Sequence, residues 1–205
     1  MYLSCYELDI KYPEVRRALK NTYEMHRTVM SAFKSVDGTC PRKQMGILYR
    51  LIMQGRGYKL YVSSLEKPVF DMPEGFKTVK DSPKDISWIK DTFKNGLKLR
   101  FDLMAMPSKK IKVSEQKNSK RVFLGKESDR EEWLHSKAAQ NGFEVLSFIE
   151  QNKEDNKIKS DSGYKSVVFK GVLKITDKDK FYNAYRYGIG AEKAFGCGML
   201  MLSKL

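Results

Sequence analysis

The glycine-rich stretch YGIGAEKAFGCG, residues 187–198, decides how the rest of the chain is interpreted. Its glycines are Gly188, Gly190, Gly196 and Gly198. Glycine adopts positive φ without steric cost and lets another backbone approach closely, and successive amides in a turn form a concave anion site. We therefore expect this stretch to offer amides to a phosphate, with Lys193 adding a mobile positive charge.

Spacing separates the stretch from two common phosphate-binding motifs. A dinucleotide fingerprint requires a third glycine at position 193, where Lys193 stands instead. The P-loop pattern GxxxxGK followed by serine or threonine is also missing. Apolar periodicity predicts a helix before the stretch, over residues 177–186, and a strand after it, over 197–202. The stretch is thus a helix-to-strand loop, and a plain flexible connector is the alternative interpretation.

The second half of the chain has the order of a ferredoxin-like unit. A helix is predicted over residues 128–141, and strands over 143–150 and 166–175. The tract 151–163 between these strands is too polar to be buried. Together with the helix and strand around the glycine loop, the order is α-β-β-α-β, which lacks only a confident first strand.

The first half has the complete ferredoxin-like order. Strands are predicted over 2–10, 45–53, 57–63 and 96–106, helices over 21–35 and 83–93, and an irregular connector over 67–82. We therefore predict an α+β fold of two tandem ferredoxin-like (RRM-like) βαββαβ domains with antiparallel sheets. The N-terminal domain, residues 1–106, carries the first long helix, and the C-terminal domain, residues 107–205, carries the glycine loop.

Composition points to a polyanionic partner. The 205 residues carry a formal net charge of +14, and 41% of them are hydrophobic, which argues against disorder. Clustered Lys and Arg release counterions from a phosphate backbone, so nucleic acid is the leading candidate. Apolar runs fall short of the roughly 18 residues of a spanning helix, and the first residues do not resemble a signal peptide. We expect a cytoplasmic protein without a membrane partner.

Three cysteines are too few and too scattered for a structural framework. Cys5, Cys40 and Cys197 are odd in number and lack C-x-x-C spacing. The sequence therefore supports neither disulfides nor a zinc knuckle, and we interpret the three as small apolar residues.

The helix predicted over residues 21–35 presents two faces. Asn21 at the N-cap and Glu24 three residues later predict a capping box. At about 100° per residue, the core face consists of Met25, Val29, Ala32, Phe33 and Val36. Tyr23, His26 and Arg27 fall on another face within the first two turns. Helix N-termini attract anions and lower imidazole pKa values, so this face is a candidate phosphate site.

The histidines limit the acid-base chemistry that the chain can perform near neutral pH. There are two, and His135 has no acidic or tyrosine partner that forms a site, so we expect it to be a surface residue. The sequence contains no metal-ligand spacing. A nuclease working without a divalent ion cuts most easily when the neighbouring 2′-hydroxyl is the nucleophile, which favours RNA over DNA.

The densest basic patch in the middle of the chain lies in residues 107–121, as a linker or an exposed hairpin. Lys110, Lys120 and Arg121 from this patch, with Lys165, are candidates for contact with an RNA backbone. Most charge runs are simply solvated, which is the alternative for these four residues.

Two segments, residues 21–27 (NTYEMHR) and 188–200 (GIGAEKAFGCGML), together resemble the CasE family of CRISPR RNA-processing endoribonucleases of type I-E systems. Residues 1–4, 16–19 and 169–177 fit as well. The middle of the chain, about 55 to 125, is similar mainly in the order of its elements.

The resemblance implies a pair of ferredoxin-like domains and a stem-loop of the CRISPR repeat RNA as the substrate. It also implies metal-independent cleavage at the base of the stem, a 2′,3′-cyclic phosphate product, no cofactor, and retention of the product within the Cascade complex beside other Cascade subunits. The family's catalytic tyrosine and histidine fall on Tyr23 and His26, and its glycine loop falls on Gly188 to Gly198. Arg27 and Lys193 are then candidates for offsetting charge on the phosphate.

Two departures from the family are visible. Thr22 stands where relatives often have proline, which alters how the helix starts rather than its chemistry. Lysine also makes up a high share of the basic residues, and lysine lacks the arginine fork, so individual RNA contacts transfer poorly. Two other functions stay open: a non-catalytic tandem RRM-like RNA-binding protein, and a purely structural subunit of a ribonucleoprotein.

Overall fold

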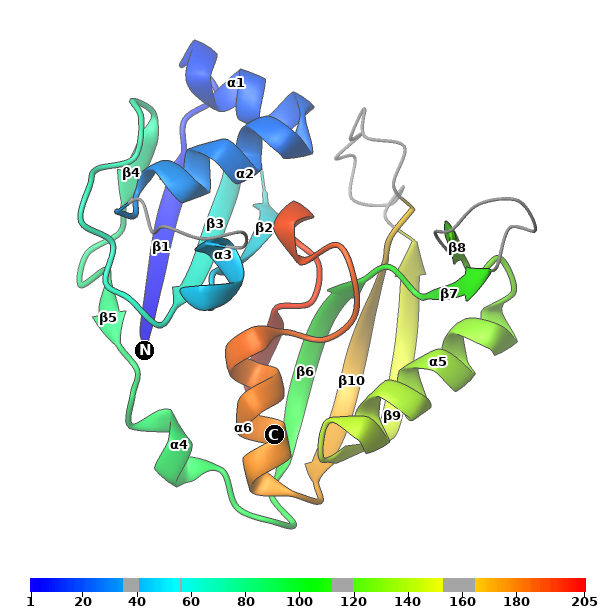
Figure 1. The fold of residues 1–205 in the computed structure, drawn as a ribbon. Coiled ribbons are helices and arrows are strands. Elements are labelled where there is room, and N and C mark those ends of the chain that lie inside the picture. The colour runs from blue at the N-terminus through cyan, green and yellow to red at the C-terminus, as the bar shows by residue number, and fades with distance from the viewer. Residues whose placement is uncertain (35–40, 56, 112–119, 153–164) are drawn as a thin grey trace.

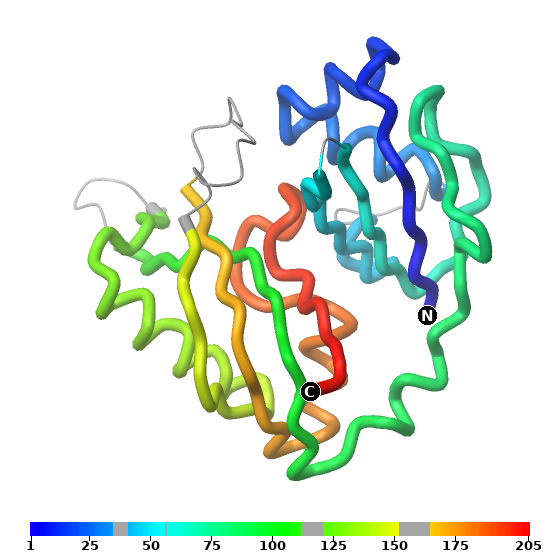
Figure 2. Tube along the Cα trace, turned by 180° about the vertical axis from the view of Figure 1, so that it is seen from behind, coloured from blue at the N-terminus to red at the C-terminus, as the bar shows by residue number. Residues whose placement is uncertain are grey.

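Two antiparallel sheets, each with its helices on one face, form the computed structural model of the protein (Figure 1). It describes residues 1–34, 41–55, 57–111, 120–152 and 165–205. Figure 2, seen from behind, shows the strands in front and the helices behind them. The α+β prediction of two tandem ferredoxin-like units with antiparallel sheets is confirmed.

The first sheet has the strand order β2-β3-β1-β4, and β5 also pairs with β1. Its strands are β1 (Tyr2–Leu8), β2 (Leu48–Gln54), β3 (Gly57–Ser64), β4 (Phe76–Thr78) and β5 (Lys84–Asp85). Helices α1 (Pro13–Lys20), α2 (Thr22–Ser31) and α3 (Pro41–Gln44) lie between β1 and β2. The hairpin predicted around residues 54–56 is confirmed by the antiparallel pairing of β2 with β3.

Sequence reasoning missed one helix of this unit and misplaced another. Pro13 stands at the start of α1, where its missing N–H costs nothing. The helix predicted over residues 83–93 is wrong in most of its length, because only α4 (Ile89–Thr92) is helical there. The second helix of the ferredoxin-like order is replaced by the connector that leads from β3 to β4.

The second sheet has the order β11-β6-β10-β9. Its strands are β6 (Lys98–Ala105), β9 (Phe143–Asn152), β10 (Val167–Ile175) and β11 (Leu200–Ser203), and its helices are α5 (Glu127–Gln140) and α6 (Lys178–Tyr187). Numbered along this unit, the order is 4-1-3-2, as in a complete ferredoxin-like βαββαβ unit. Asp177 caps α6 by accepting from the amides of Asp179 and Lys180.

The strand predicted over residues 96–106 exists as β6, but it belongs to the second sheet. It pairs with β10 and β11, whereas the short β4 takes the fourth place in the first sheet. The division predicted between residues 106 and 107 is therefore wrong by one strand. Apolar alternation through Leu99, Phe101 and Leu103 reveals a strand, but it does not reveal which sheet the strand joins.

The basic segment after β6 forms an exposed hairpin of β7 (Ser108–Ile111) and β8 (Lys120–Phe123). This confirms one of the two interpretations given to it. Much of the polar tract 151–163, together with Cys40 and Val36, lies outside the described residues.

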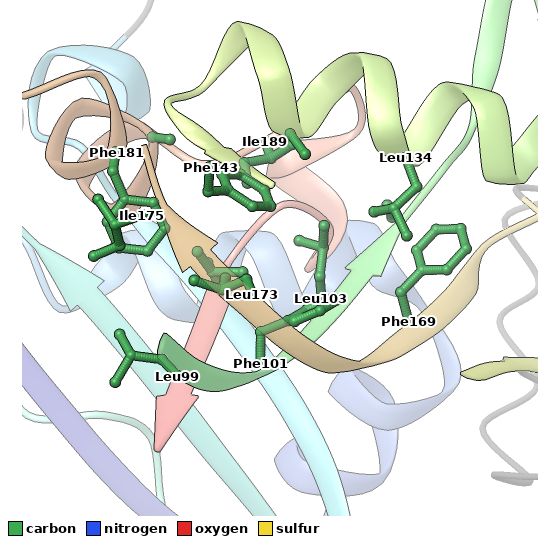
Figure 3. Close-up of a cluster of buried hydrophobic side chains, with 14 of the residues drawn as sticks. Leu99, Phe101, Leu103, Leu134, Phe143, Phe169, Leu173, Ile175, Phe181 and Ile189 are labelled. Atoms are coloured by element: carbon green, nitrogen blue, oxygen red, sulfur yellow. The ribbon is translucent and has the colours of Figure 1, made fainter. Parts of the chain in front are cut away.

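Aromatic side chains fill the core between the second sheet and its helices. Phe143, Phe169 and Phe181 are fully buried there, and Leu134 of α5 points at Phe169 of β10 (Figure 3). Arg130 of α5 is also buried, but both Glu150 oxygens and two backbone carbonyl oxygens accept its hydrogen bonds. A buried charge satisfied in this way ties α5 to β9 without leaving a group unpaired.

The two units meet along β2, an edge strand of the first sheet. The Arg50 guanidinium on β2 donates to Asp102 Oδ1 on β6 at 2.9 Å, and Lys170 Nζ on β10 lies 3.7 Å from Asp102 Oδ2. Arg50 has 7% of its side chain exposed and Asp102 has 24%. The ion pair therefore crosses the junction in a largely water-excluded place. None of the described helices is long and apolar enough to span a membrane.

Asp102→Ala should destabilise the protein by about 3 kcal/mol, because removing one partner leaves the Arg50 charge buried and unpaired. Urea unfolding followed by circular dichroism measures the loss. Glu144→Ala is the matched control: its pair with Lys174 lies in the same sheet but is about half exposed, so its loss should cost less than about 1 kcal/mol. Equal costs for the two variants would contradict the role given to the junction pair.

Candidate active site

Helix α2 begins as the sequence predicts, but with half of a capping box. Asn21 Oδ1 accepts from the Tyr23 amide at 2.8 Å. In a full capping box the Glu24 side chain would accept from the Asn21 backbone amide. Here that amide donates to the Arg17 carbonyl oxygen, and Glu24 pairs with Arg27 at 3.1 Å. Met25 and Val29 are buried on the core face. This anchoring fixes which residues of α2 face outward.

The outward face of α2 presents Tyr23, His26 and Arg27 in different environments. Tyr23 is 58% exposed, and the Arg27 side chain is exposed apart from its contact with Glu24. His26 is half-buried, and burial, with the positive charge of Arg42, lowers its pKa below the usual value. The imidazole is therefore neutral at neutral pH and free to accept a proton.

The glycine loop reaches α2 from the opposite end of the chain. Its one turn of 3₁₀ helix, η2 (Lys193–Phe195), puts the Phe195 ring against His26, with centroids 6.4 Å apart and planes at 70°. This is an edge-on aromatic contact. In Figure 1 the turn lies directly beneath α2, beside β2. Residues far apart in sequence thus share one site.

The loop glycines are required by close packing within the protein. Gly188 has φ +78°, and a Cβ there would lie 2.8 Å from a Leu48 methyl group of β2. A Cβ on Gly190 would meet the Trp133 ring at 3.1 Å, and one on Gly196 would meet the Tyr49 ring at 2.9 Å. Glycine at these positions brings the loop against both units.

Two of the loop amides expected to bind phosphate are already engaged. The Gly188 amide donates to the Ala184 carbonyl oxygen, and the Gly198 amide donates to the Met104 carbonyl oxygen at 2.7 Å. The expected bed of glycine amides is therefore wrong for these two residues. Their physical role is to close the loop onto α6 and β6.

Lys193 is the most perturbed cation of the site. Its ammonium donates to the Gly188 carbonyl oxygen at 2.7 Å. Burial, together with the charges of Arg42, Lys43 and Lys137, lowers its pKa to about 8. A cluster of like charges around a half-buried ammonium is stabilised by a bound anion. The local positive charge therefore favours an anion at this place.

Sequence reasoning missed Arg42 and Phe195 as parts of this site. Arg42, on α3, is near enough to His26 and Lys193 to lower both pKa values, and it donates to the Ile47 carbonyl oxygen at 2.8 Å. A lone arginine in a short helix carries no sequence signal. Phe195 lies inside the glycine motif, so its position could have been suspected.

The remaining basic candidates belong to the β7–β8 hairpin or to the segment that leads into β10. Lys110 and Arg121 are exposed on the β7–β8 hairpin, and Lys165 is exposed just before β10. Lys120 contributes its backbone to β8. Figures 1 and 2 show the hairpin beyond β9 and β10, on the far side of the second sheet from α2.

A pocket of about 130 Å³ adjoins the His26 face at the junction of the two units. Thr22, Tyr49 and Arg50 line it, and each has a buried polar atom without a partner in the described structure: Thr22 Oγ1, Tyr49 Oη and Arg50 Nε. Burial raises the pKa of Tyr49 far above its usual range. Each unsatisfied group costs about 1–3 kcal/mol, so the pocket walls retain unused hydrogen-bonding capacity.

His135, the acidic residues and the described cysteines form no further candidate site among the described residues. His135 is exposed, 4.0 Å from Glu131 and edge-on to Phe148, as expected for a surface residue. Among the described residues there is no group of three or more His, Cys, Asp or Glu placed to hold a metal ion. Cys197 is buried and Cys5 is half-buried.

The fold and site define a tandem ferredoxin-like protein with a histidine among clustered cations between its two units. A family model described as "CRISPR associated protein" matches residues 1–204. The chain belongs to this family of CRISPR-associated proteins, as a member of the CasE family. The resemblance found in the sequence is confirmed.

Similar proteins cover nearly the whole chain. It is 28% identical over 222 residues to the CRISPR-associated endoribonuclease Cse3 of Thermus thermophilus, covering 99% of this chain and 100% of that protein. A structure of CRISPR endoribonuclease Cse3 bound to a 19-nucleotide RNA has a TM-score of 0.80 at 27% identity, with 98% of each chain covered. Cas6e of Escherichia coli shares the fold, with a TM-score of 0.72 at 24% identity over 100% of both chains.

Gly198→Ala should disrupt the loop more than an ordinary left-handed glycine substitution. Its Cβ would lie 2.7 Å from the Ile189 carbonyl oxygen. Gly96 has the same φ of +87° and nothing within 4 Å of a Cβ, so Gly96→Ala is the matched control. We expect Gly96→Ala to cost about 1–2 kcal/mol and Gly198→Ala about 1–3 kcal/mol more. Thermal unfolding measures both, and equal shifts would show that the loop yields freely.

Proposed function

We propose that the protein is a CRISPR repeat-RNA endoribonuclease that cuts the base of a stem-loop without a metal ion and stays bound as a Cascade subunit. The names of its relatives support this proposal, because Cse3 is called an endoribonuclease. One Thermus thermophilus Cse3 structure, 26% identical with a TM-score of 0.76 over 98% of both chains, holds an RNA representing a pre-cleavage complex. A related chain, 27% identical with a TM-score of 0.68 over 100% of both chains, comes from a CRISPR RNA-guided surveillance complex. We expect this protein to act in the cytoplasm.

The observation that carries the proposal is the half-buried His26 beside the cations of the glycine loop and α3. A neutral imidazole accepts a proton, and the Arg42 charge is near enough to both His26 and Lys193 to lower their pKa values. This combination suits a reaction in which a hydroxyl loses its proton while negative charge grows on a phosphate.

The proposed reaction is a transesterification within the RNA. His26 takes the proton of the 2′-hydroxyl, and the 2′-oxygen bonds to the adjacent phosphorus. The bond from phosphorus to the 5′-oxygen breaks, and Tyr23, exposed three residues earlier on α2, gives a proton to the leaving oxygen. The products are a 2′,3′-cyclic phosphate and a 5′-hydroxyl.

The cations of the site act on the phosphate. The Lys193 ammonium donates one hydrogen bond to the Gly188 carbonyl oxygen, so its two other N–H groups can donate to a phosphoryl oxygen. Arg27 can leave its exposed contact with Glu24 for the RNA, because such contacts are weak. Gly190 and Gly196 hold the loop close to Trp133 and Tyr49, and Gly188 and Gly198 close its two ends.

The stem is expected to bind farther out. A-form RNA is recognised mainly through its shape and phosphates, and Lys110, Lys120, Arg121 and Lys165 are the candidate contacts. The exposed hairpin β7–β8 would meet the stem, while α2 and the glycine loop would meet its base.

The test is incubation of the purified protein with a labelled repeat transcript from the same genome, in EDTA. A defined fragment ending in a cyclic phosphate is expected, and a 2′-deoxy nucleotide just 5′ of the cut should block its formation. His26→Ala should slow single-turnover cleavage by about 10²- to 10⁴-fold with binding nearly unchanged.

His135→Ala is the matched control, since His135 is the other histidine of the chain and lies on the surface. It should cut at the wild-type rate. A gel shift without any fragment would favour the non-catalytic RNA-binding alternative. Loss of Cascade assembly without loss of RNA binding, on mutation of the glycine loop, would favour the structural subunit.

The pH profile of kcat/KM should be bell-shaped, because this ratio reports the free enzyme. The active neutral form of His26 grows as pH rises through its lowered pKa, so the rising limb should lie below pH 6.5. The Lys193 charge is lost as pH rises through about 8, which gives the falling limb. Lys193→Arg keeps its charge at all these pH values and should remove the falling limb. A limb that persists near pH 8 in this variant would exclude Lys193 as its source.

A further inference from the structure

The pocket at the junction of the two units has the walls of a site for a flat, partly polar group. Apolar side chains from α1, β10 and β6 line it, among them Leu19, Val168 and Met104. Phe195 lines the pocket and also contacts His26. The pocket is therefore separated from the candidate catalytic histidine by one aromatic ring.

Three residues that line the pocket each have one buried polar atom without a partner in the described structure. Tyr49 is 4% exposed and Arg50 is 6% exposed, and Tyr49 Oη, Arg50 Nε and Thr22 Oγ1 are all unpaired. Three of the seven such atoms in the described residues belong to residues lining this one pocket. Buried polar groups are normally hydrogen-bonded, so we expect an occupant of the pocket to draw these three side chains toward itself and to pair with them.

The charges that line the pocket are paired with one another, because the Asp102 carboxylate lies against both Arg50 and Lys170. The walls are otherwise largely apolar. A nucleobase combines flat apolar faces with donors and acceptors along one edge, as these walls require.

A route into the pocket lies along the open face of the second sheet. A second hollow of about 590 Å³ on this face shares Asp102 and Lys170 with the pocket. Arg100 and Lys170 give it positive charge, and Ile149 and Val172 give it exposed or partly exposed apolar surface. A single strand of RNA suits such a surface, where phosphates meet cations and bases meet apolar groups.

We propose that this pocket binds one unpaired nucleobase of the RNA substrate, next to the scissile phosphate, and so sets the position of the cut. A base held between Tyr49, Arg50 and Phe195 would bring its own sugar and phosphate to the His26 face of α2. The inference rests on the proposed function, because it assumes that the substrate is RNA. It adds a specificity site to the catalytic one.

The experiment measures binding of repeat transcripts from the same genome to the His26→Ala protein, which should leave them uncut. In each transcript, one unpaired nucleotide flanking the stem is made abasic. We expect one abasic position to weaken binding by about tenfold or more, and the others to have little effect. Adding Tyr49→Phe removes a hydroxyl while keeping the ring, and should weaken binding of the intact transcript about three- to tenfold.

The two losses should not add if the base and the Tyr49 hydroxyl meet. Tyr49→Phe should therefore cost nothing further against the decisive abasic transcript. Tyr61→Phe is the matched control, because Tyr61 is on the neighbouring strand β3 and its hydroxyl lies beside Cys5 instead of the pocket. It should leave every transcript unaffected.

Equal binding of all abasic transcripts would overturn the inference and leave water as the occupant; so would full additivity of the two losses. If the wild-type protein still cut the intact transcript in EDTA, the proposed function would stand without the base pocket. If neither binding nor cleavage of any repeat transcript occurred, both would fail. The abasic series needs no change in the pocket, so it decides the matter even if Tyr49→Phe unfolds the protein.

Discussion

Close packing of the glycine loop against the edge strand β2 is the constraint on which the rest of the structure depends. Gly188 leaves no room for a Cβ beside Leu48, and Gly196 leaves none beside Tyr49. Because packed interiors deform little, these contacts fix the second unit against the first. They also set the height of η2 relative to α2, so that Phe195 meets His26. The buried pair of Arg50 and Asp102 holds the same junction at a neighbouring position of β2.

This arrangement is electrostatically unfavourable at the candidate active site, where positive charges repel one another. The folding that brings Lys193 near Arg42, Lys43 and Lys137 gathers like charges around a half-buried ammonium. Each raises the free energy of the others, and a polyanion relieves the repulsion on binding. Part of the net charge of +14 is therefore concentrated at the candidate active site. Functional sites commonly carry such unfavourable local energies, which the surrounding packing supports.

Local patterns predicted most elements because they depend on neighbouring residues. Asn21 and Asp177 identified helix starts, and the alternation in β9 and β10 identified strands. The same patterns predicted the strand β6 but could not assign it to a sheet, since the alternation of Leu99, Phe101 and Leu103 does not depend on which sheet the strand joins. They failed for residues 83–93 because a short segment is stabilised by its tertiary contacts more than by its propensity. Within the site, the spacing of Tyr23, His26 and Arg27 on one face was readable, whereas Arg42 was not.

The sequence by itself determined the class of fold, the face of α2 that bears Tyr23 and His26, and membership of the CasE family through its two terminal motifs. It could do so because helix periodicity, capping and glycine spacing act over a few residues. Only the tertiary structure decided that β6 belongs to the second sheet, that Phe195 and Arg42 lie near His26, and that three residues with unpaired buried polar atoms line a pocket between the units. These depend on contacts between residues distant in the chain, whose geometry follows from how whole side chains fit together in the folded interior.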